Sequence, residues 1–98
     1  MITVDKFNVR IVRAGDRYGR DNCLTYDKDE PLVEFYIGDY FVSRYYVATI
    51  LGTDGYGSGE GGLILDGGDI ERTTVKSKDM DTVREYLKEQ TTHSYYGA

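Results

Sequence analysis

The chain has 98 residues, a formal net charge of −5, a single proline and an apolar share of 40%. This length and composition predict one globular domain over residues 1–98 and exclude a disordered chain. No apolar run approaches the roughly 18 residues of a membrane span, and Met1–Asp5 lacks the basic start and apolar centre of a signal peptide. The sequence therefore predicts a cytoplasmic protein.

Charge is distributed unevenly along the chain. Residues 1–20 carry five basic and two acidic side chains, a balance of +3, whereas residues 21–71 carry two basic and eleven acidic ones, a balance of −9. Residues 72–98 return to +1. An acidic middle segment repels nucleic acid and can attract a basic protein surface; the alternative is a solvated surface that keeps the protein soluble.

The N-terminal third predicts a β-hairpin. Residues Phe7–Arg13 alternate apolar and polar side chains, which is the pattern of a strand with one buried face. Residues 14–20 contain two glycines and an aspartate, which suit a turn, and residues 22–26 are the expected second strand. A charged loop, Asp27–Pro31, follows this hairpin.

The densest run of large apolar and aromatic side chains is Leu32–Leu51, and we expect the core to be organised around it. Leu32–Ile37 has the clearest strand pattern and predicts a central strand. Residues 43–51 are ambiguous, because their apolar side chains fit helical spacing while their β-branched residues favour a strand. We favour a helix that Ser43 caps and Gly52 ends.

The segment Gly52–Gly62 holds six glycines in eleven residues and predicts a mobile loop. Gly57, Gly59 and Gly62 match the G-x-G-x-x-G pattern of dinucleotide sites, but such a site needs a helix directly after it. Leu63–Leu65 has the character of a strand instead, so we interpret the match as accidental.

The C-terminal part predicts a hairpin followed by a helix. Asp66–Asp69 suits a tight turn better than a cation site, which would need more oxygen ligands, and residues 70–76 return as a strand. A helix then begins at the capping residue Ser77 and buries the stripe Met80, Val83 and Leu87. Residues 91–98 lack such a pattern and are expected to fray.

Together these elements predict an α+β domain, with an antiparallel sheet of four to five strands and one or two helices packed on one face. We expect no enzymatic activity, no metal and no cofactor, because Cys23 and His93 are the only cysteine and histidine and are far apart in the chain. Cys23 is interpreted as a small buried hydrophobic residue and His93 as a solvated side chain. The third of our three hypotheses is an enzyme in which folding brings Cys23 and His93 together.

Five segments of the chain carry a recognisable pattern: Val9–Arg13, Gly15–Gly19, Leu32–Tyr36, Phe41–Tyr46 and Leu65–Gly68. These segments resemble a group of small uncharacterised proteins from bacteria and their mobile elements. The resemblance carries no enzymatic motif and implies a fold more than a function. In size, acidity and aromatic richness the chain also resembles the anti-CRISPR and anti-restriction inhibitors of phages, which implies the cytoplasm of a bacterial host.

The first hypothesis is a protein-binding inhibitor of a host defence complex, such as a CRISPR effector or another defence nuclease. Acidic side chains would engage the basic nucleic-acid channel of that complex, and tyrosines would anchor the contact because they bury a large area at low entropic cost. Alternatively, the ten tyrosines fill the edges of a small core. The candidate partner-binding residues are Asp27, Asp29, Glu30, Asp54, Tyr56 and Glu60.

The second hypothesis is a nucleic-acid-binding module. A strand followed by a turn would place four arginines on one surface with a tyrosine between them, where contact with phosphates is favourable. The acidity of the whole chain counts against it. The candidate residues are Arg10, Arg13, Arg17, Tyr18 and Arg20.

Overall fold

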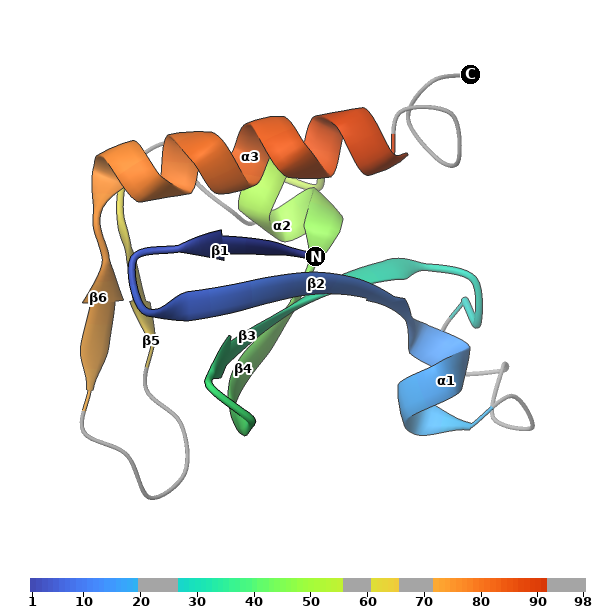
Figure 1. Ribbon diagram of the computed structural model, residues 1–98. Coiled ribbons are helices and arrows are strands. Elements are labelled where there is room, and N and C mark those ends of the chain that lie inside the picture. The colour runs from blue at the N-terminus through green and yellow to red at the C-terminus, as the bar shows by residue number, and fades with distance from the viewer. Residues whose placement is uncertain (20–26, 56–60, 66–71, 92–98) are drawn as a thin grey trace.

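The computed structural model describes residues 1–19, 27–55, 61–65 and 72–91 (Figure 1). In chain order the described elements are β1 (Ile2–Val4), β2 (Phe7–Arg13), α1 (Ala14–Tyr18), β3 (Pro31–Ile37), β4 (Tyr40–Tyr46), α2 (Val47–Leu51), β5 (Leu63–Leu65), β6 (Thr73–Val75) and α3 (Ser77–Thr91). The predicted α+β class is confirmed. Among the helices of these ranges, none is long and apolar enough to cross a membrane.

The strands form two antiparallel sheets rather than one. The larger sheet has the order β1-β2-β3-β4, and β5 pairs with β6 in a separate sheet. β2 pairs with β3 along its whole length, from Phe7 opposite Ile37 to Arg13 opposite Pro31. β3 is therefore central, as predicted, while the strand expected at residues 22–26 lies outside the described residues.

The core lies between the larger sheet and the helices α2 and α3, which cover the same face of that sheet (Figure 1). The predicted helical stripe is confirmed, since its three side chains are fully buried. The smaller sheet closes one end of this core with Leu65 and Val75. The main core side chains are Phe7, Val9, Val33, Phe35, Val42, Val47, Ile50, Leu65, Val75, Met80, Val83 and Leu87.

The turn predicted at residues 14–20 is wrong for its first five residues, because Ala14–Tyr18 forms the short helix α1. The backbone N–H groups of its first two residues donate to the carbonyl oxygens of Glu30 and Lys28, at 2.9 and 2.7 Å. These long-range bonds satisfy donors that a helix start leaves without intrahelical partners. Gly19, with a φ of 90°, ends the helix.

The helix predicted at residues 43–51 is also wrong for its first half. Ser43 lies inside β4 and caps no helix, whereas Gly52, with a φ of 75°, ends α2 as predicted. Pairing with β3 decides the outcome, because the same apolar residues fit both spacings and only the strand completes the hydrogen bonds of the sheet. A register shift in this pairing brings Val42 into the core, where it is 3% exposed.

The C-terminal elements follow the sequence pattern. β6 lies within the predicted strand at residues 70–76, and α3 begins at Ser77. Thr91, expected to fray, is instead the last residue of α3 and is buried. The turn at residues 66–69, the tail from residue 92, Cys23 and His93 lie outside the described residues.

The Leu87→Ala variant should lower the free energy of unfolding by about 2 to 5 kcal/mol, because it leaves a cavity between α3 and the sheet. Urea denaturation followed by circular dichroism measures this change. The control is Ile64→Ala, whose side chain is 54% exposed and should change stability by less than about 0.5 kcal/mol. Equal stabilities of the two variants would contradict this account of the core.

Candidate functional site

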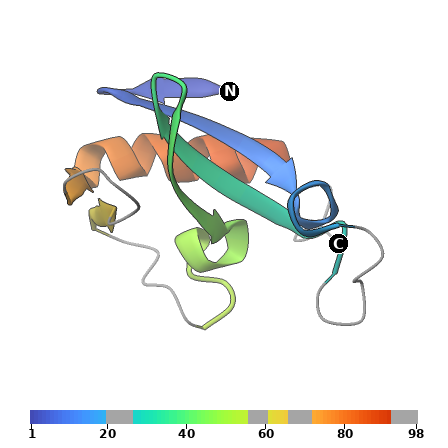
Figure 2. The ribbon, with the colours of Figure 1, turned by 90° about the horizontal axis from the view of Figure 1, so that it is seen from below.

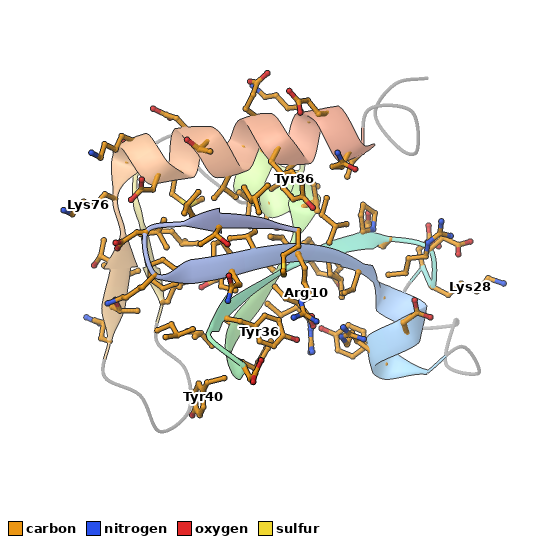
Figure 3. All side chains as sticks on the ribbon, in the orientation of Figure 1. Arg10, Lys28, Tyr36, Tyr40, Lys76 and Tyr86 are labelled. Carbon is orange, nitrogen blue, oxygen red and sulfur yellow. The ribbon has the colours of Figure 1, made fainter. Side chains whose placement is uncertain are left out.

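The register of the larger sheet places charged and aromatic residues of three strands side by side. Arg10 lies opposite Glu34, and Glu34 lies opposite Arg44. The neighbouring row joins Asn8, Tyr36 and Phe41 in the same way. Opposed residues of antiparallel strands share one face, so both rows lie on the same face of the sheet. Figure 3 shows Arg10 and Tyr36 on the side of the sheet away from α3, the side from which Figure 2 views the ribbon.

Glu34 is the centre of this arrangement and is fully buried. Its carboxylate accepts hydrogen bonds from Arg17 Nε at 2.8 Å, Arg17 Nη2 at 3.1 Å, Arg44 Nε at 2.8 Å and the Tyr36 hydroxyl at 2.9 Å. These donors come from α1, β3 and β4. This carboxylate therefore links α1 to β3 and β4.

The charge of Glu34 is maintained by these contacts. Burial by itself raises the pKa of the carboxyl, but the hydrogen bonds from Arg17, Arg44 and Tyr36 outweigh it and lower the pKa to about 2. The hydrogen bond to Glu34 in turn raises the pKa of Arg17. Both arginines thus stay charged and are held in one orientation by a charge-assisted bond.

Aromatic rings and guanidinium groups alternate around this carboxylate. The Arg10 guanidinium lies 4.1 Å from the centre of the Tyr36 ring, and Arg44 lies 4.8 Å from Phe41 and 5.6 Å from Tyr18. Tyr36 and Phe41 meet edge to face at 5.7 Å. We call the set of Arg10, Arg17, Tyr18, Glu34, Tyr36, Phe41 and Arg44 the arginine–aromatic face.

This face combines positive charge with exposed flat rings. Among its seven residues, three carry a positive guanidinium group and one, Glu34, carries a negative carboxylate. The side chain of Arg10 makes no hydrogen bond or ion pair with the described residues, and its buried Nε atom has no acceptor. As whole residues, Tyr18 and Phe41 are 44% and 41% exposed. The face can therefore accept an anion and a planar group together.

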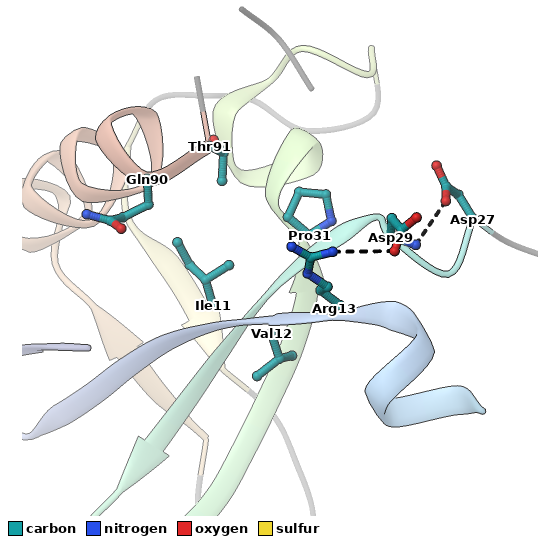
Figure 4. A pocket seen from close by; sticks show the side chains of 8 residues that line it. All are labelled: Ile11, Val12, Arg13, Asp27, Asp29, Pro31, Gln90 and Thr91. Carbon is teal, nitrogen blue, oxygen red and sulfur yellow. Dashed lines mark hydrogen bonds and ion pairs between the residues drawn. The ribbon is translucent and has the colours of Figure 1, made fainter. Parts of the chain in front are cut away.

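The structure brings together three of the arginines and tyrosines predicted for nucleic-acid contact, namely Arg10, Arg17 and Tyr18. It separates Arg13, which pairs with Asp29 at 3.4 Å on the α3 side of the sheet (Figure 4). Arg20 lies outside the described residues.

Sequence reasoning missed Glu34, Tyr36, Phe41 and Arg44 as members of this site. A helix predicted at residues 43–51 would not pair with β3, so it gave Arg44 no place on the sheet. Period-two alternation through residues 40–46 would not have found the site either, because the register shift between β3 and β4 puts Phe41 and Arg44, three residues apart, on one face.

Four of the acidic residues predicted for partner binding lie near one another. Burial raises the pKa of Glu30, and the charges of Asp27 and Asp54 raise it further. The Asp29 backbone N–H donates to Asp27 Oδ1 at 2.9 Å. Tyr56 and Glu60, the remaining two, lie outside the described residues.

A cleft of about 530 Å³ adjoins this acidic group (Figure 4). Its walls combine apolar and charged side chains, from Ile11, Val12, Arg13, Asp27, Asp29, Pro31, Gln90 and Thr91. Across the described ranges, no group of three or more His, Cys, Asp and Glu side chains is arranged to hold a metal ion.

No protein family, curated protein or solved structure matches this chain. The resemblance of its five segments to small proteins of bacteria and mobile elements therefore stays a prediction. The site is defined by its own geometry alone.

Glu34 should make stability depend on acid pH. Its folded-state pKa of about 2 lies below the ordinary value of 4.5, so its contribution is full above pH 4.5 and is lost as the pH falls toward 2. Urea denaturation between pH 2 and 6 should show this fall in the wild type. The Glu34→Gln variant should have a free energy of unfolding that is lower by about 3 kcal/mol at neutral pH. This free energy should also vary less between pH 2 and 6 than that of the wild type.

The matched control is Glu85→Gln, which changes an exposed carboxyl on α3 in the same way. It should keep the pH dependence of the wild type. If Glu34→Gln also keeps that dependence unchanged, the buried carboxylate is not its source.

Proposed function

We propose that the protein is a small nucleic-acid-binding module and that the arginine–aromatic face is its contact surface. The observation that carries the proposal is Arg10, a guanidinium stacked on Tyr36 with no acceptor among the described residues. A guanidinium in this state gains most from a phosphate, which its planar donors match in geometry.

The arrangement of the other two arginines supports the same ligand. Glu34 holds Arg17 and Arg44 in place, so little side-chain entropy is lost when a phosphate approaches them. Phosphate contacts provide most of the affinity for nucleic acid, and exposed rings add contacts to the bases. This face offers both within one patch.

The net charge of −5 limits the strength of such binding without preventing it. Charges more than about 10 Å apart are screened at 0.1 M salt, so the local charge of the face governs the contact. At long range the acidic residues repel a polyanion. Binding is therefore expected to be moderate in affinity and local in origin.

Arg10→Ala should weaken the binding of a labelled oligonucleotide by about tenfold in fluorescence anisotropy at low salt, because a charged hydrogen bond is lost. It should also reduce the slope of log affinity against log salt by about 0.7, the value for one phosphate of a single strand. The control Lys78→Ala removes the same charge from the exposed start of α3 and should leave both quantities unchanged. No binding by the wild type at low salt would refute the proposal.

A second candidate is a protein-binding inhibitor, and the clustering of Asp27, Asp29, Glu30 and Asp54 favours it. Close carboxylates raise one another's cost of ionisation, and a basic partner surface relieves that cost. The partner would be the basic channel of a CRISPR effector or another defence nuclease in the bacterial cytoplasm. The arginine–aromatic face plays no part in this candidate function.

The double variant Asp27→Asn and Glu30→Gln should abolish capture of such an effector and protection of phage in cells, if this candidate holds. It keeps the shape of the cluster and removes two charges. The control Glu85→Gln and Glu89→Gln removes two charges from α3 and should retain both activities. Equal behaviour of the two double variants would reject the acidic cluster as the contact.

A further inference from the structure

We infer that the ligand of the arginine–aromatic face is a single strand, with unpaired bases stacked on Phe41 and Tyr18 on either side of Arg44. This inference rests on the proposed nucleic-acid function and specifies its substrate class. It is carried by the exposed rings, whereas the proposed function is carried by Arg10.

The two rings are positioned by one guanidinium. Phe41 belongs to β4 and Tyr18 to α1, and both rings lie against Arg44, at 4.8 and 5.6 Å. Their centres are therefore within about 10 Å of each other, the sum of these distances. Bases close together along an extended strand can span such a separation, with a phosphate near the guanidinium between them.

Both rings remain substantially exposed although the cluster around them is tightly packed. Phe41 is in contact with Tyr36 edge to face, and Tyr36 is bound to Glu34 through its hydroxyl. The rings are thus held by neighbours in the sheet while 41% of Phe41 and 44% of Tyr18 can be contacted from outside. An exposed, fixed aromatic ring loses little entropy when a base stacks on it.

A duplex fits this surface poorly. Its bases are stacked inside the helix, and their edges are reached by helices or β-ribbons that enter a groove. The contact surface here is the face of a sheet, with rings that lie among the side chains of β3, β4 and α1. Such rings meet the flat side of a base only when that base is unpaired.

The inference is tested with fluorescence anisotropy on five probes that carry equal numbers of phosphates or carboxylates. These are a single-stranded DNA, the RNA of the same sequence, a duplex, and an abasic sugar–phosphate strand; polyglutamate serves as an acidic protein mimic. The single strands should bind at least about fivefold more tightly than the abasic strand, because each stacked base contributes that much or more.

Phe41→Ala and Tyr18→Ala should each weaken binding of the single strands by about fivefold or more. Binding of the abasic strand should not change, which shows that each variant keeps its fold and its arginines. Phe41→Trp should restore binding, and the control Ile64→Ala, an exposed apolar residue of β5, should have no effect.

Each outcome bears on one of the two claims. If the single strands, the duplex and the abasic strand bind alike, stacking is refuted while phosphate binding by the face stands. If polyglutamate binds as tightly as the single strands, the face recognises acidic proteins and the inference fails. If none of the nucleic acids binds at low salt, the proposed function fails as well.

Discussion

The carboxylate of Glu34 is the group on which the arginine–aromatic face depends. Burying an ionised carboxylate without partners costs far more free energy than a small domain can supply, so the chain must bring donors to it. It does so from three elements, with Arg17 of α1, Tyr36 of β3 and Arg44 of β4. The position of α1 and the alignment of two strands are thus linked to one polar group.

This network gives the two faces of the larger sheet different physical characters. The face toward α3 buries apolar side chains and provides most of the stability. The opposite face buries a carboxylate and leaves rings and guanidinium groups at the surface. A face of this second kind is suited to binding, because its side chains are already fixed and desolvated in part.

Positive and negative groups are also separated in space. Asp27, Glu30 and Asp54 lie close together near the start of β3, whereas Arg10 and Arg44 lie in the middle of the sheet. Although the net charge of the chain is −5, the arginine–aromatic face has a local excess of positive charge. Composition describes the field far from the molecule, while the local arrangement governs contacts within about 10 Å.

Local patterns in the sequence were sufficient for β2, β3 and α3, because alternation or helical spacing there serves one buried face and no rival conformation fits. They were insufficient for residues 43–51, whose apolar spacing fits a helix and a strand equally, so that only pairing with β3 decided. The site divides in the same way. Arg10, Arg17 and Tyr18 are near in sequence and were found, while Glu34 and Arg44 join them only through cross-strand register, which is a property of the folded sheet.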